Sequence, residues 1–153
     1  MSTPDHDAAL ASLREAVPPS ENLAFGVAAG LVAMLVGTAA WVAVTAGTGY
    51  QIGYLAVGVG FLVGFSMRKF GRGGTPLFAG IAAGLSLLGC ALGNLFTGCH
   101  FISSEFNLPF GQVVGSLDLT GVREIMTAMF SPIDVLFYGL AIWAGWKYSI
   151  VRE

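Results

Sequence analysis

Residues 49–64 read GYQIGYLAVGVGFLVG, an apolar stretch in which glycines recur at helical spacing. In a helix that turns by about 100° per residue, four glycines fall on one face within roughly 60° of one another: Gly49, Gly53, Gly60 and Gly64. A face without side chains lets a second backbone approach closely, which is how helices associate in lipid. The stretch therefore predicts a transmembrane helix that packs through its glycines.

The composition of the 153-residue chain is that of a membrane protein: 55% of its residues are apolar, 10% are charged, and the mean hydropathy is +0.75. A soluble domain carries about 25% charged residues. The net charge of −2 does not favour a nucleic-acid partner. Cys90 and Cys99 are too few for a disulfide scaffold or a four-ligand zinc site. We expect one membrane domain without a metal or cofactor.

Apolar stretches long enough to cross a bilayer predict an all-α protein of four transmembrane helices. Their approximate ranges are 23–45, 50–67, 76–96 and 132–150. About 20 residues are needed, because a helix rises about 1.5 Å per residue through a hydrocarbon core of about 30 Å. The preceding residues, 1–22, are expected to form a cytoplasmic tail with a short amphipathic helix over 7–17.

The outer connection, residues 97–131, is expected to be irregular in its first half. Its second half predicts an amphipathic helix, because Val122, Ile125 and Met129 recur at helical spacing opposite Arg123 and Glu124. The following Ser-Pro-Ile-Asp at 131–134 has the pattern of a helix start with a capping box.

Small residues predict how the helices pack. Those of the first span share a narrow face that matches the glycine face of the second, so we expect an antiparallel hairpin. The third span has small residues on two opposite sides and is expected to lie centrally between neighbours. The predicted helix-packing residues are Gly26, Gly30, Gly37, Gly49, Gly53, Gly60, Gly64, Gly80, Gly84, Gly89 and Gly93.

An internal repeat is one interpretation of the first and third spans. LAFGVAAGL at 23–31 aligns without gaps on LFAGIAAGL at 77–85. A true repeat would relate two parallel hairpins by an axis along the membrane normal. The alternative is that helices rich in glycine and alanine coincide through low complexity.

Basic residues predict the orientation. Cytoplasmic flanks of membrane spans carry an excess of lysine and arginine. With both termini cytoplasmic, only Arg123 lies outside, and the other basic residues lie inside: Arg14, Arg68, Lys69, Arg72, Lys147 and Arg152.

Two strings carry a resemblance. Residues 49–64, with GYQIG and AVGVG, and residues 77–94, LFAGIAAGLSLLGCALGN, resemble a family of small, uncharacterised bacterial inner-membrane proteins. The resemblance implies a bacterial inner-membrane location and supplies no activity. Some relatives carry a cysteine-rich, zinc-ribbon-like segment ahead of the spans. The N-terminal tail has no cysteine here, so no zinc site is implied.

Polar residues within the predicted spans are few. Asn94 is the clearest, with Thr38 and Gln51 as weaker companions, and these three form the possible polar site. An interhelical hydrogen bond, worth roughly 0.6 kcal/mol, is the favoured role of Asn94. Outside the third span, Cys99-His100 with Glu105 lacks the spacing of a metal site.

The sequence favours a non-enzymatic membrane protein that oligomerises or serves as an accessory or scaffold subunit of a membrane complex. Its expected partners are the lipid bilayer and copies of itself or other membrane subunits. The alternative is a small transporter or channel for a neutral or small solute. An enzyme is the weakest hypothesis, resting on scattered residues of the outer connection: His100, Glu105 and Asp118.

Overall fold

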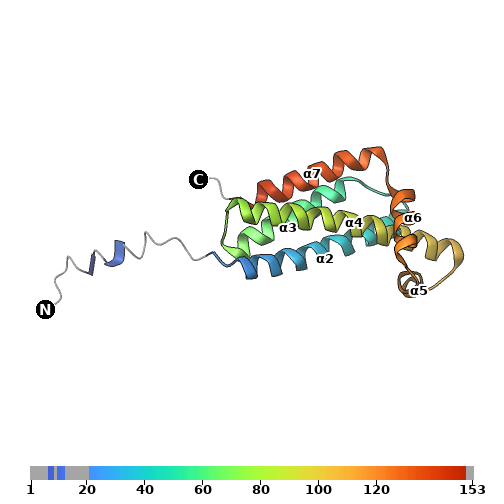
Figure 1. The fold of residues 1–153 in the computed structure, drawn as a ribbon, viewed down its shortest axis with the longest axis horizontal. Helices are drawn as coiled ribbons and strands as arrows, with labels where there is room; N and C mark the ends of the chain where they lie inside the picture. Colours follow the sequence, from blue (N-terminus) through green and yellow to red (C-terminus); the bar gives the residue numbers. More distant parts are fainter. Residues whose placement is uncertain (1–6, 9, 13–20, 151–153) are drawn as a thin grey trace.

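In the computed structural model, which describes residues 7–8, 10–12 and 21–150, the described chain is helical and contains no strand. Four long helices form a bundle (Figure 1): α2 Leu23–Thr48, α3 Tyr54–Gly71, α4 Pro76–Phe106 and α7 Pro132–Ser149. Two shorter helices, α5 Phe110–Gly115 and α6 Leu119–Met129, lie at one end of the bundle. The all-α prediction is confirmed.

Two helices of the described chain, α2 and α4, are each long and apolar enough to cross a membrane. A third candidate span consists of α6 and α7 together, which are bent by 99° at their junction. The helix α3 is not among these candidates, and the two basic residues in its last turn, Arg68 and Lys69, lower its mean hydropathy. The chain is therefore a helical protein with two to three helices capable of spanning a membrane.

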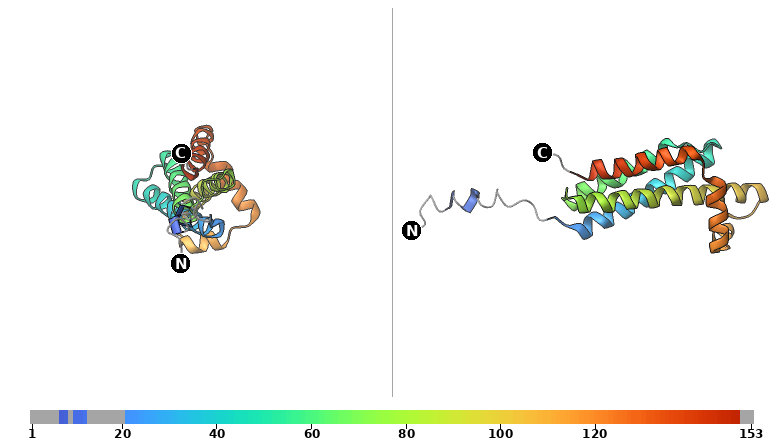
Figure 2. Two further views of the ribbon diagram at one scale, coloured as in Figure 1. Left: turned by 90° about the vertical axis from the view of Figure 1, so that its left-hand side faces the viewer. Right: turned by 45° about the horizontal axis from the view of Figure 1, so that its top comes forward.

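The bundle has α3 and α4 at its centre. These two helices contact each other, and each also contacts α2 and α7, whereas α2 and α7 do not touch within the described chain. The chain alternates in direction, so α2 runs parallel to α4 and α3 runs parallel to α7 (Figures 1 and 2). The central position expected for the third span is observed.

The arrangement lacks the symmetry that a duplicated hairpin would give. A two-fold axis along the membrane normal would exchange α2 with α4 and α3 with α7, so the contact between α3 and α4 would require one between α7 and α2. The first contact exists and the second does not. The matching strings at 23–31 and 77–85 therefore have no counterpart in the arrangement of the helices.

The first two helices form an antiparallel hairpin, as predicted, but not through matching glycine faces. Gly37 of α2 lies against Val59 of α3, a residue of the face opposite the glycines. Gly60 and Gly64 of α3 lie instead against α7, while Gly71, beyond the predicted span, lies against Gly26 of α2 and Phe78 of α4. The expectation that these two glycine faces meet is wrong, because a small-residue face specifies a close approach and does not specify which helix approaches.

Helix ends follow local chemistry. Asn22 caps α2 by accepting a hydrogen bond from the Phe25 amide at 3.0 Å. Gly49 ends it in the left-handed region, at φ 71°, a conformation that glycine adopts without strain. The second span was expected from residue 50, but α3 begins at Tyr54 because residues 49–53 complete the reversal.

The start of α7 is as predicted. The Ser131 amide donates to the Asp134 carboxylate at 2.7 Å, and the Asp134 amide donates in return to the Ser131 side-chain oxygen, which completes the capping box. Asp134 is buried and its carboxylate serves the helix start.

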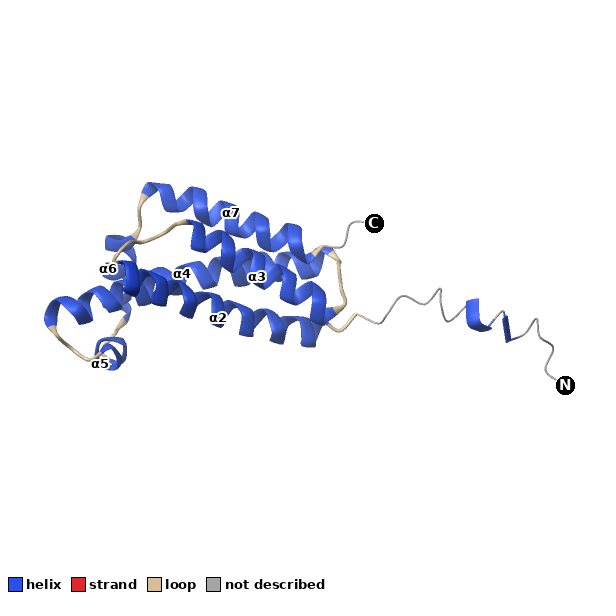
Figure 3. Ribbon diagram, turned by 180° about the vertical axis from the view of Figure 1, so that it is seen from behind, coloured by secondary structure: helices blue, strands red, loops and turns tan. Residues whose placement is uncertain are grey.

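The outer connection is more ordered than the sequence predicted. Helix α4 continues beyond residue 96 to Phe106, so the expectation of an irregular segment is wrong for residues 97–106. No proline interrupts the helix before Pro109, and the last turns of α4 gain a second small core in which Cys99, Val113 and Ile125 are buried. Figure 3 shows α5 and α6 gathered around this end of α4.

The amphipathic helix predicted within residues 97–131 is confirmed as α6. Ile125 is buried against α4, while Arg123 and Glu124 are exposed. The helix predicted over 7–17 lies largely outside the described residues; of its positions, 7–8 and 10–12 are helical.

Candidate polar cluster and helix-packing surfaces

A polar cluster joins three helices in the half of the bundle next to α5 and α6. The Asn94 carboxamide of α4 is 1% exposed. Its Oδ1 accepts a hydrogen bond from Gln51 Nε2, which comes from the loop before α3. Its Nδ2 donates to the Tyr138 hydroxyl of α7 at 2.5 Å. The side chain thus uses its acceptor toward one neighbour and a donor toward another.

Two further hydrogen bonds extend the cluster. The Tyr138 hydroxyl donates to the Cys90 carbonyl at 3.3 Å, which ties α7 back to α4 one turn below Asn94. The Cys90 thiol donates to the Ala56 carbonyl of α3 at 3.9 Å. Interhelical bonds of this kind are individually worth about 0.6 kcal/mol in a bilayer. Their combined geometry fixes how α3, α4 and α7 are aligned.

Thr38 does not belong to this cluster. Its hydroxyl donates to the Gly89 carbonyl at 3.2 Å and joins α2 to α4. The structure therefore brings together Asn94 and Gln51 and leaves the third predicted polar residue in a separate contact. Tyr138 was missed in the sequence, although it lies three residues before Ala141 and seven before Gly145, on the buried face of α7.

Three buried polar atoms have no hydrogen-bond partner within the described chain: Trp41 Nε1, Thr45 Oγ1 and Thr97 Oγ1. The Trp41 ring packs on Gly93 of α4, and α2 and α4 run parallel. One turn further along, Thr45 and Thr97 therefore reach the same level of the α2–α4 contact. A polar atom without a partner is costly in an apolar interior.

Gly60 and Gly64 of α3 form a close backbone contact with α7. A Cβ atom built on Gly64 would lie 2.7 Å from the Gly145 carbonyl oxygen, and one on Gly60 would collide with the backbone of Ala141. Gly53, the N-cap residue of α3, faces the Phe137 ring. Only glycine lets the two backbones approach this closely.

The glycines of α2 face both central helices. Gly26 lies against Phe78 and against the backbone of Gly71, while Gly30 lies against the Met67 side chain. Within α4, Gly89 and Gly93 accept side chains of α2 and α3. These positions lie in contacts between helices of the same chain.

Three predicted packing glycines do not contact another part of the described chain. Gly49 ends α2, and no atom lies within 4 Å of the position of a Cβ there. Gly80 and Gly84, one turn apart on α4, are likewise open and lie on its exposed side. The small-residue surface of α4 therefore has one half covered by the bundle and one half bare.

The residues of the enzyme and metal hypotheses are not assembled into a site. Asp118 caps α6 by accepting from the Gly121 amide at 2.7 Å. Cys90 and Cys99 are both buried free thiols. No group of three or more histidine, cysteine or acidic side chains is placed to hold a metal ion among the described residues. Comparison of the chain with models of known families, with curated proteins and with solved structures finds no match.

Proposed function

We propose that the chain is a four-span protein of a bacterial inner membrane, with both termini cytoplasmic, and that it acts as a non-enzymatic oligomerising or accessory subunit. The packing of α3 and α7 along α2 and α4 supports four spans, because these shorter helices share the length of the bundle. At 18 residues each, they cover about 27 Å of a core of about 30 Å. The resemblance of residues 49–64 and 77–94 supports the location.

The observation that carries the subunit role is the bare side of α4. Gly80 and Gly84 are open there, and the apolar side chains beside them, such as Leu77 and Leu88, are exposed. A helix surface without side chains offers acyl chains no additional contact, whereas a second helix can pack closely against it. Asn94, Gln51 and Tyr138 are engaged with one another, which supports a structural role for this cluster.

Association through α4 can be tested with one matched pair of substitutions. Gly84→Ile fills the bare side of α4, and Gly139→Ile makes the same change at an equally open glycine on α7. The measurement is the molar mass of the tagged protein extracted from native membranes in mild detergent, with mass spectrometry of co-purifying proteins. We expect Gly84→Ile to reduce association and Gly139→Ile to preserve it. A wild-type protein that is only a monomer without a co-purifying protein would refute the role.

A specific observation favours the transporter as second candidate. The unpartnered atoms of Trp41, Thr45 and Thr97 lie on the same half of the bundle as Asn94, so a small polar guest would find hydrogen-bond partners there. Flux of small neutral solutes into reconstituted vesicles tests this role. Loss of flux in Asn94→Leu would support it, and unchanged flux would remove its best residue.

A further inference from the structure

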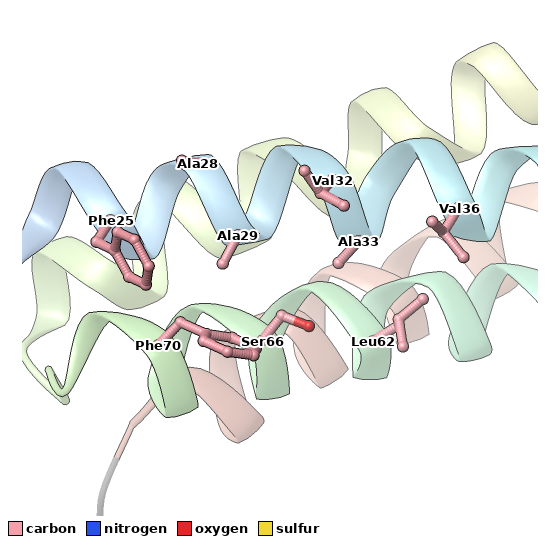
Figure 4. Close-up of a pocket in the computed structure, with 9 residues that line it drawn as sticks. All are labelled: Phe25, Ala28, Ala29, Val32, Ala33, Val36, Leu62, Ser66 and Phe70. Atoms are coloured by element: carbon pink, nitrogen blue, oxygen red, sulfur yellow. The ribbon is translucent and has the colours of Figure 1, made fainter.

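An apolar groove lies between α2 and α3 on the lateral surface of the bundle. It has a volume of about 480 Å³, and its lining includes Ala29 and Val32 of α2 and Leu62 and Ser66 of α3. Figure 4 shows these side chains along the two helices, with Phe25 and Phe70 facing each other at one end. The small side chain of Ala29 leaves room for the groove, and Ser66 is the one polar residue in its lining.

A polar hollow adjoins this groove. It has a volume of about 400 Å³, shares Phe25 and Phe70 with the groove, and is otherwise lined by Asn22, Lys69 and Arg72. The centroids of the two shared rings are 6.4 Å apart. The groove and the hollow therefore adjoin at these two rings, and together they offer an apolar body and a basic end.

The basic end is not neutralised by the protein. Within the described chain, neither Lys69 nor Arg72 forms an ion pair; the lysine ammonium lies 5.8 Å and 5.9 Å from two phenylalanine ring centroids. Glu21 is the acidic residue of this end within 21–150, and its carboxylate accepts from the Gly74 amide at 3.4 Å. The opposing basic residues of this end within the same range are Arg68, Lys69, Arg72 and Lys147.

The start of α2 adds to this positive end. Asn22 uses its side-chain oxygen to cap the helix, and the unpaired amides of the first turn give a helix N-terminus partial positive charge. The Asn22 amide also donates to the Gly71 carbonyl at 2.9 Å, so the ends of α2 and α3 are held together beside Lys69 and Arg72. An anion at the hollow would meet the positive end of α2 together with these two basic side chains.

The length of the groove matches one leaflet of a bilayer. Its lining on α2 extends from Phe25 to Val36. At a rise of about 1.5 Å per residue this is about 16 Å, close to half of a hydrocarbon core of about 30 Å. An acyl chain of the leaflet next to the basic end can lie along it with its headgroup at the hollow.

We propose that this site binds an anionic phospholipid, with the phosphate against Lys69 and Arg72 and one acyl chain over Ala29 and Val32. Basic pockets between helices at the cytoplasmic surface bind acidic headgroups. Here the basic residues would bind the headgroup and the adjoining apolar surface would contact the acyl chain. Selectivity comes from the headgroup, because an acyl chain meets similar apolar contacts elsewhere in the bilayer. A zwitterionic lipid offers no net negative charge.

The test is native mass spectrometry of the full-length protein in mild detergent with phosphatidylglycerol and phosphatidylcholine in equal amounts. We expect preferential retention of phosphatidylglycerol. The double variant Lys69→Gln/Arg72→Gln should bind it about 25-fold more weakly, from about fivefold for each basic residue. The control Arg68→Gln/Lys147→Gln removes the same charge from the same end, outside the site, and should retain binding. Equal weakening in the control, or equal retention of both lipids, would overturn the proposal.

A groove variant and a soluble anion test the acyl chain. Ala29→Phe should fill the groove and reduce lipid retention, whereas Ala40→Phe, on the exposed side of α2 outside the groove, should not. Melting temperature reports folding, and Ala29→Val replaces the larger variant if that one fails to fold. Unchanged retention in the folded Ala29 variant would overturn the proposal. Inorganic phosphate that raises the melting temperature as much as phosphatidylglycerol would overturn it as well, by showing that an anion without acyl chains suffices.

Discussion

At the scale of single residues, Asn94 shows how an isolated polar group is used inside an apolar bundle. Its position was predicted from the sequence, because a carboxamide stands out among leucines and glycines of a span. Its partners were not, since Gln51 and Tyr138 are 43 and 44 residues away along the chain. Which distant groups meet it depends on helix rotation, and a pattern of glycines does not fix rotation to within one hydrogen bond.

Removing one hydroxyl should measure the value of this cluster. Tyr138→Phe deletes the acceptor of the Asn94 bond and the donor to the Cys90 carbonyl. We expect a loss of about 1 kcal/mol in the free energy of unfolding. Reversible unfolding in mixed detergent micelles is the measurement. The matched change Tyr54→Phe, at a tyrosine that is 76% exposed, should leave stability unchanged. Equal effects of the two substitutions would contradict a structural role for the cluster.

At the scale of helices, the sequence predicts which faces are thin but not which helix covers each face. The face of α3 that contains Gly60 was assigned to α2 and is covered by α7. Both partners are apolar and carry small residues, so local composition does not distinguish them. The choice depends on the whole set of contacts, in which Val59 fills the space against Gly37 and Gly89. Pairing between helices is therefore a property of the assembled bundle.

Two glycines of α3 offer a direct test of the close approach to α7. Gly60→Ala places a Cβ against the Ala141 backbone, while Gly58→Ala places one in open space. The helix-propensity gain, up to about 1 kcal/mol, is the same for both. Overpacking at Gly60 opposes it by about 1–3 kcal/mol. We expect lower unfolding stability for Gly60→Ala and equal or higher stability for Gly58→Ala. Stabilisation by both substitutions would show that the helices are farther apart.

Some helix ends can be predicted from the sequence and others cannot. The start of α7 was predictable because Ser131 and Asp134 determine it within four residues. The end of α4 was not, because residues 97–106 contain weak helix formers such as Thr97 and Gly98, and their helical state depends on burial against α5 and α6. Local capping interactions can be predicted from a sequence, whereas stabilisation by contacts distant in the chain cannot.

At the scale of the whole molecule, charge divides the bundle into two unlike ends. Lys69, Arg72 and Lys147 lie at the end where α3 and α7 finish, whereas Arg123 lies on α6 at the opposite end. The opposite end also carries the apolar residues of α5 and α6, which lie across the ends of the long helices (Figure 2). Such helices suit an interface between headgroups and acyl chains. The bundle therefore presents a basic end and an amphipathic end.

This division predicts that the basic end faces the cytoplasm, since lysine and arginine are enriched on that side of membrane proteins. Single cysteines placed at Thr75 and at Ser116 report the two ends. The native thiols are fully buried, so wild-type protein is the control and should stay unlabelled by a membrane-impermeant maleimide. In cells with a permeabilised outer membrane, we expect labelling of Ser116→Cys, and labelling of Thr75→Cys only after the inner membrane is broken. The reverse pattern would invert the orientation and place the groove and the hollow with Lys69 and Arg72 at the outer leaflet.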